Sequence, residues 1–144
     1  MSNEQQIVVI VPSSDIGKSF GSVSREAAYE VCENLRPTDT RLVALSKLVL
    51  GDRAAGEIVA QHPTVTIDGC KQMCAAKMVK QSGGNIAREA TVLDAFRQHK
   101  ELKPEGIAEL NEAGIKLACA LAADIAETVA KIGDARAAEG ERHA

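Results

Sequence analysis

The chain has 144 residues, which is enough for one domain with a substantial hydrophobic core. Its net charge of −3 and its 2% of aromatic residues argue against nucleic-acid binding, which relies on basic patches and on aromatic side chains that stack on bases. The N-terminus is polar and no apolar run approaches the length of a membrane span. We therefore expect a cytoplasmic protein that contacts neither nucleic acid nor a membrane.

The first two thirds of the chain alternate between strand-like and helix-like segments. The β-branched run at 6–11 is typical of a strand that is buried on both faces. Strand–helix alternation predicts right-handed crossovers and a mostly parallel sheet. We therefore predict a small three-layer α/β fold, with a four-stranded sheet and helices on both faces. The expected strands are 6–11, 41–45, 64–67 and 86–93, and the expected helices are 23–35, 52–61 and 70–81.

The C-terminal third follows a helical pattern throughout. Apolar residues recur there at spacings of three and four, which predicts a long helix over 104–132, with Pro104 and Glu105 in its first turn. Its two apolar stripes suit packing across the sheet and also onto a partner, so we predict a homodimer or a subunit of a larger complex. The whole chain, 1–144, is expected to be one α/β domain with a core over 6–100 and a charged tail at 134–144.

Two of the four cysteines stand where chemistry is expected. Cys70 and Cys74 follow the predicted third strand and the turn Asp68-Gly69, and a helix starting at residue 70 would place both on one face. Free N–H groups and the helix dipole in the first turn favour a thiolate at Cys70. Asp68 is suited to cap the helix, and Gly69 permits the tight turn. The alternative is that both cysteines are small buried residues.

The loop after the first strand is the other candidate part of the site. Ligands of open parallel sheets bind beyond the carboxyl ends of the strands, where this loop and the cysteine loop both lie. If the first and third strands are neighbours, Ser13, Ser14 and Gly17 lie near Cys70. The glycine pattern matches neither the dinucleotide fingerprint nor the phosphate loop, so nucleotide binding is disfavoured. The predicted residues around the ligand are Ser13, Ser14, Gly17, Asp68 and Gly69.

The other candidate residues favour packing over chemistry. Cys32 and Cys119 lie in helical patterns and are expected in the core. His62, at a helix end before a proline, suits a surface or capping role. No Ser-His-Asp set or pair of carboxylates stands out, so no catalytic residue is predicted and a role other than catalysis is favoured.

Around Asp68-Gly69-Cys70 and Cys74 the chain resembles the DGC-domain family, which is named for this tripeptide and described as zinc-binding. Those proteins also have a glycine after the first strand, which is matched by Gly17. The resemblance covers roughly 7–95. It implies thiolate metal ligation, with Cys70 and Cys74 as the ligands and Asp68 as a cap or an orienting contact.

The resemblance is incomplete at the other cysteine positions of the family. Ser13 and Ser14 stand where the family has an N-terminal cysteine cluster, and no cysteine is present at 44–46, where a further one is expected. Tetrahedral zinc takes four ligands, so two thiolates leave the site two ligands short. A two-fold dimer would supply four sulfurs for a shared zinc ion or [4Fe–4S] cluster. Completion by Cys32 or by a partner protein is the alternative.

Three functions follow from these observations. The favoured one is a metal-binding accessory or assembly protein that holds zinc or an iron–sulfur cluster on the cysteine loop. The second is a dithiol redox protein in which Cys70 attacks and Cys74 resolves. The third is a non-catalytic structural subunit that keeps the fold and the loop without ligating a metal.

Overall fold

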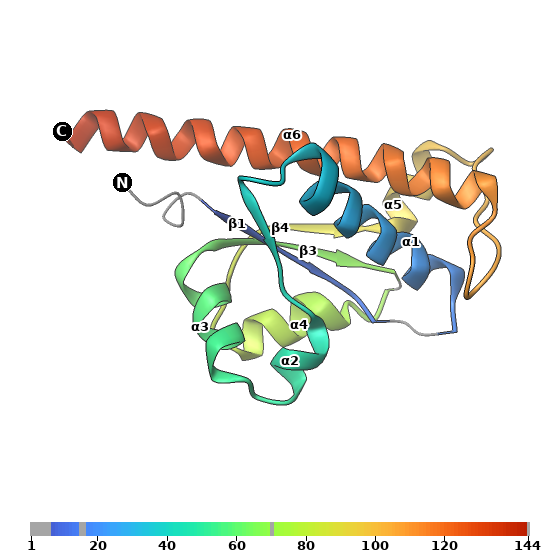
Figure 1. The fold of residues 1–144 in the computed structure, drawn as a ribbon, viewed down its shortest axis with the longest axis horizontal. Coiled ribbons are helices and arrows are strands. Elements are labelled where there is room, and N and C mark those ends of the chain that lie inside the picture. Colours follow the sequence, from blue (N-terminus) through green and yellow to red (C-terminus); the bar gives the residue numbers. More distant parts are fainter. Residues whose placement is uncertain (1–6, 15–16, 70, 144) are drawn as a thin grey trace.

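The computed structural model of the protein describes residues 7–14, 17–69 and 71–143. It contains a four-stranded sheet in the order β2-β1-β3-β4, and every neighbouring pair of strands is parallel. The predicted three-layer α/β fold is confirmed (Figure 1). The strands are β1 (Val8–Pro12), β2 (Thr40–Leu42), β3 (Pro63–Asp68) and β4 (Asn85–Thr91).

Helices cover both faces of the sheet (Figure 1). One face carries α1 (Ser19–Tyr29), the π-helix η2 (Glu30–Leu35), α5 (Val92–Gln98) and the long α6 (Glu112–His143). The other face carries α2 (Leu45–Val49), α3 (Arg53–Gln61) and α4 (Cys74–Gln81). No helix in the described part of the chain is long and apolar enough to cross a membrane.

The central strand β1 supplies side chains to two separate cores. All five of its residues are buried, and successive side chains of a strand point to opposite faces. Val8 and Ile10 therefore pack beneath α1 and α6, whereas Val9 and Val11 pack against α2, α3 and α4. Leu117, Leu121, Ile125 and Val129 are the largest buried side chains that α6 adds to the first core.

Several element boundaries differ from the prediction. The helix predicted over 70–81 begins at Cys74, and the helix predicted over 23–35 is α1 continued by the π-helix η2. The short helices α2 and α5 were not expected. The long helix begins at Glu112 rather than at Pro104, and it continues through the expected tail at 134–144 as far as His143.

The start of α6 is fixed by Asn111. Its side-chain Oδ1 accepts hydrogen bonds from the N–H groups of Gly114 at 2.8 Å and Glu105 at 3.1 Å. Its Nδ2 donates to the carbonyl of Lys103 at 3.2 Å. Because these bonds hold the residues around Pro104 as a folded loop, the helix cannot begin there.

Candidate functional site

The two candidate loops meet at the centre of the sheet's carboxyl edge. After β1 the chain crosses to β2 on one side, whereas β3 lies on the other side. In open α/β sheets such a switch point opens a crevice in which ligands bind. The predicted condition that the first and third strands are neighbours is therefore met, and the loops that follow them are in contact at this edge.

Ser13 joins the two loops directly. Its backbone N–H donates to the carbonyl of Ile67 at 2.8 Å, and its Oγ accepts the N–H of Gly69 at 3.1 Å. The Oγ atoms of Ser13 and Ser24 lie 3.0 Å apart, which ties the pair to α1. Ser13 is 1% exposed, so its hydroxyl is a buried structural link between the two loops. Ser24 was not expected at the site, since nothing in the sequence marks it.

Asp68 caps α4 from the end of β3. Its Oδ1 accepts the N–H of Ala75 at 2.7 Å, and its Oδ2 accepts the N–H of Ala76 at 3.1 Å. The side chain is buried, and its charge lies at the positive end of the helix dipole. Asp68 therefore has the expected capping role. It is not adjacent to α4 in the sequence, however, because the helix begins only at Cys74.

Cys74 is the first residue of α4, and its side chain is exposed. The preceding residue, Met73, has φ 55°, which is a left-handed backbone conformation that is uncommon for a residue with a side chain. Met73 was not expected at the site, since the sequence carries no signal for this conformation. Backbone strain of this kind often clusters at functional sites. Cys70 lies outside the described residues.

The observed start of α4 changes the prediction made for the cysteines. The sequence placed Cys70 in the first turn of the helix, with Cys74 on the same face. Because the helix begins at Cys74, that residue occupies the first turn, and the argument that the two share one helix face is wrong. Residues 71 and 72 form a turn before it.

Cys32 lies far from this edge of the sheet. It belongs to η2 and is hydrogen-bonded to Thr40, the first residue of β2, which is paired with Val8 at the amino edge. Burial raises the pKa of the Cys32 thiol, and the hydrogen bond to Thr40 only partly opposes that effect. Its expected packing against the core is confirmed. Since Cys74 follows the carboxyl end of β3, Cys32 cannot complete a site there within one chain.

Cys119 is exposed on α6, so its expected burial in the core is wrong. Its neighbour Ala118 and the later Ala122 face the sheet, which turns Cys119 to the outer side of the helix. The pKa of the Cys119 thiol is raised, first by desolvation and then by the negative charges of Glu30 and Glu26. This thiol is therefore separate from the cysteine loop.

The remaining predicted residues follow the carboxyl end of β1. Ser14 is half-buried beside Ser13, and Gly17 is exposed with φ +93°, a conformation that favours glycine before the start of α1. A cavity of about 200 Å³ on the β4 side of the cysteine loop is lined by Lys71 and Met73. Ligand binding by the serines and glycines stays a prediction.

The described residues contain no complete set of ligands for a metal ion. No group of three or more His, Cys, Asp or Glu side chains in that part of the chain is placed to hold one. Both carboxylate oxygens of Asp68 accept backbone hydrogen bonds, and Cys74 is the only described cysteine at this edge. Cys74 alone does not fit a zinc or iron–sulfur centre, so any such centre at this edge needs ligands from outside the described residues.

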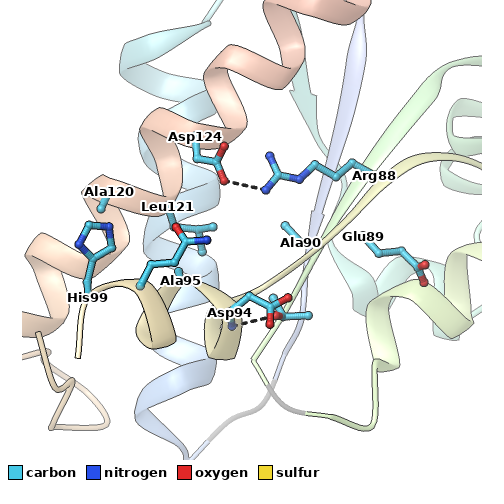
Figure 2. Close-up of a pocket in the computed structure, with 11 residues that line it drawn as sticks. Arg88, Glu89, Ala90, Asp94, Ala95, His99, Ala120, Leu121 and Asp124 are labelled. Atoms are coloured by element: carbon cyan, nitrogen blue, oxygen red, sulfur yellow. Dashed lines mark hydrogen bonds and ion pairs between the residues drawn. The ribbon is translucent and has the colours of Figure 1, made fainter.

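A smaller cavity of about 70 Å³ lies between β4, α5 and α6 (Figure 2). Arg88 crosses it from β4 and donates to Asp124 Oδ2 and Thr128 Oγ1, both at 2.6 Å. His99 lies at the opposite end, near Ala120 and Leu121 (Figure 2). Because the Arg88 guanidinium is already hydrogen-bonded to α6, it links this helix to β4. The cavity therefore has little hydrogen-bonding capacity left for a ligand.

Comparison with known proteins supports one family assignment. The family model of the DGC domain matches residues 9–132, which includes both loops and most of α6. Searches of curated proteins and of solved structures each returned no match. The family match extends beyond the region in which the motifs resemble those proteins. The chain therefore belongs to the DGC-domain family.

Proposed function

We propose that this protein is a thiolate metal-binding accessory protein, without catalytic activity of its own, that holds zinc or an iron–sulfur cluster through Cys70 and Cys74. The observation that carries the proposal is the position of Cys74. It is an exposed thiol at the first residue of α4, the helix that follows β3 at the switch point of the sheet. Soft thiolate ligands favour these metals over hard cations such as magnesium.

The fixed surroundings of the cysteine loop support a role in ligation. Asp68 anchors the far end of the loop to α4, and Ser13 anchors its near end at Gly69. Ligands of metal sites are commonly held in place by such outer hydrogen bonds, which reduce the entropy lost on binding. In this arrangement Ser13, Asp68 and Gly69 position the loop, and they do not bind the metal themselves.

The site is expected to be completed by a second molecule. Two thiolates supply half of a tetrahedral site, and both Cys32 and Cys119 lie elsewhere in the same chain. A second copy of the chain is the simplest source, because a two-fold axis beside the cysteine loop brings four equivalent sulfurs together. A partner protein that supplies two ligands is the alternative.

The test measures metal content and native mass on the same anaerobically purified protein. The variant combines Cys70→Ser with Cys74→Ser. The matched control combines Cys32→Ser with Cys119→Ser, which leaves the loop unchanged and removes the same number of thiols. We expect metal or cluster in the parent and the control but not in the loop variant. We also expect one metal centre per two chains, with a native mass of twice 15.2 kDa.

Three outcomes would contradict parts of the proposal. Absence of metal and cluster from the parent, even after reconstitution with Zn²⁺ or with iron and sulfide, would remove the ligand role and favour a structural subunit. A ratio of one metal centre per monomer would keep the cysteines as ligands but reject the shared site. Reversible formation of a Cys70–Cys74 disulfide without metal would instead favour the redox function.

A further inference from the structure

Two adjoining cavities lie on the α1 side of the molecule. One, of about 90 Å³, lies beyond the carboxyl ends of β1 and β2 and is lined by Ser14 and Ser46. The other, of about 270 Å³, lies between α1 and the loop before α6 and is lined by Ile107. Arg25 and Tyr29 line both cavities and therefore form a shared wall.

Arg25 presents a positioned cation to these cavities. Its Nη1 donates to the carbonyl of Ser14 at 2.5 Å, and its Nη2 donates to Ser22 Oγ at 3.2 Å. No carboxylate of the described residues lies within ion-pair distance of this guanidinium. Guanidinium has five N–H donors and matches the geometry of a carboxylate, so Arg25 retains donors for an anionic ligand.

The larger cavity offers an apolar surface next to that cation. Tyr29, Ile107 and Ile115 are 39%, 58% and 51% exposed, although large apolar side chains are usually buried. All three line this one cavity. Apolar side chains gathered around a concave surface, together with a few charged or polar groups, are typical of a small-molecule site.

The loop that carries Ile107 is held in place against α1. Ser22 Oγ donates to the carbonyl of Ile107 at 2.8 Å, while it also accepts from Arg25. Gly106 has φ +96°, and a Cβ at this position would overlap the carbonyl oxygen of Glu109. The loop conformation therefore needs glycine, and it keeps Ile107 over the cavity next to the guanidinium.

The other charges in the larger cavity restrict the ligand. Glu26 and Glu109 line it together with Arg25. A second anionic group on the ligand would meet these carboxylates, which disfavours nucleotides and dicarboxylates. An uncharged apolar body would avoid this repulsion.

We propose that this site binds a small monocarboxylic acid with an apolar body. The carboxylate accepts hydrogen bonds from Arg25, and the body packs against Tyr29, Ile107 and Ile115. The smaller of its two cavities is lined by Ser13 and Ser14 and therefore adjoins the cysteine loop, but neither cavity is lined by Cys74 and binding of the acid does not depend on metal ligation.

The test is a titration of the full-length, isotope-labelled protein with hexanoate, followed by amide NMR shifts, with EDTA present so that the cysteine loop makes no contribution. Acetate and hexylamine serve as probes of the carboxylate alone and of the apolar chain alone. We expect hexanoate to shift amides near Ser14, Arg25 and Ile107, and to bind more tightly than either probe. Arg25→Gln is expected to weaken hexanoate binding by about tenfold to a hundredfold, because it removes charge-assisted hydrogen bonds.

Arg41→Gln is the matched control, since Arg41 is also an arginine without an ion pair among the described residues but lies on β2. It should leave binding unchanged. Ile107→Glu changes an exposed side chain and leaves Arg25 in place. It should also abolish hexanoate binding, because the new carboxylate repels that of the ligand. This second variant tests the proposal even if Arg25→Gln disturbs folding. The proposal is overturned if hexanoate does not bind the parent, if Ile107→Glu binds it equally well, or if acetate binds as tightly as hexanoate.

Discussion

Replacement of the buried Asp68 by alanine should destabilise the protein more than the corresponding replacement of a capping residue at the protein surface. The substitution leaves the N–H groups of Ala75 and Ala76 without their acceptor, and these residues are 0% and 1% exposed, so water cannot replace it. A buried polar group without a partner costs about 1–3 kcal/mol, and the lost charge at the helix terminus adds about 0.3–1 kcal/mol. With two such groups, we therefore expect the free energy of unfolding to fall by roughly 2–7 kcal/mol.

Urea denaturation followed by circular dichroism, in EDTA, measures this loss. Asp52→Ala is the matched control, because Asp52 caps α3 through one hydrogen bond to the N–H of Ala55 at 3.0 Å and is exposed. Loss of such a cap costs about 0.5–2 kcal/mol. Asp68→Asn should fall between the two, since its amide keeps one acceptor oxygen. If Asp68→Ala costs no more than Asp52→Ala, the buried cap does not have the energetic role assigned to it.

Three further predictions concern other parts of the fold. Gly133→Ala should raise the free energy of unfolding by about 0.5–1 kcal/mol, because a Cβ there meets nothing within 4 Å and alanine favours the helix; an unchanged urea midpoint would contradict this. Arg88→Lys should lower the free energy of unfolding by about 1 kcal/mol, because lysine cannot replace both 2.6 Å hydrogen bonds. It should also speed amide hydrogen exchange in α6, and Asp124→Asn should have a smaller effect on both measurements. Burial raises the pKa of the Cys32 thiol above its usual 9.0, so the thiol loses its proton at a lower pH in the unfolded chain than in the folded one. The free energy of unfolding should therefore fall as pH rises above about 9. Urea midpoints measured across that range should decline less steeply for Cys32→Ala than for the parent.

The sheet, and the contact between the two candidate loops, could largely be predicted from residue pattern. The run from Val8 to Val11 reads as a strand buried on both faces, and the structure buries it on both. On the condition that the first and third strands are neighbours, the general rule for open sheets predicted that the loop at Ser13 lies beside the turn at Gly69, and a hydrogen bond of 3.1 Å joins them. These predictions needed only residue type, spacing and topology.

The details of the cysteine loop could not be predicted in the same way. Helix propensity is continuous from Lys71 to Gln81, so no local signal marks Cys74 as the first helical residue. The boundary depends on Asp68, whose side chain takes up the N–H groups of Ala75 and Ala76 from outside the helix. Long-range hydrogen bonds of this kind override propensity.

Other missed elements did carry a usable signal. Thr91 accepts the N–H of Asp94 at 3.1 Å, which is the side-chain cap that a Thr-x-x-Asp sequence favours, and it starts α5. Asn111 likewise caps α6 through Gly114. The strand pattern before Thr91 and the proline at 104 favour other boundaries, and these competing signals mask both caps.

The position of α6 along the chain has a consequence for synthesis. This helix follows all four strands, yet it supplies Leu117, Leu121 and Ile125 to the core beneath it. The face of the sheet formed by Val8 and Ile10 therefore stays incompletely covered until the ribosome has released α6, whereas α2, α3 and α4 cover the opposite face earlier. A nascent chain that stalls before Leu117 exposes apolar side chains on one face of the sheet. Chaperones and proteases are expected to recognise such chains.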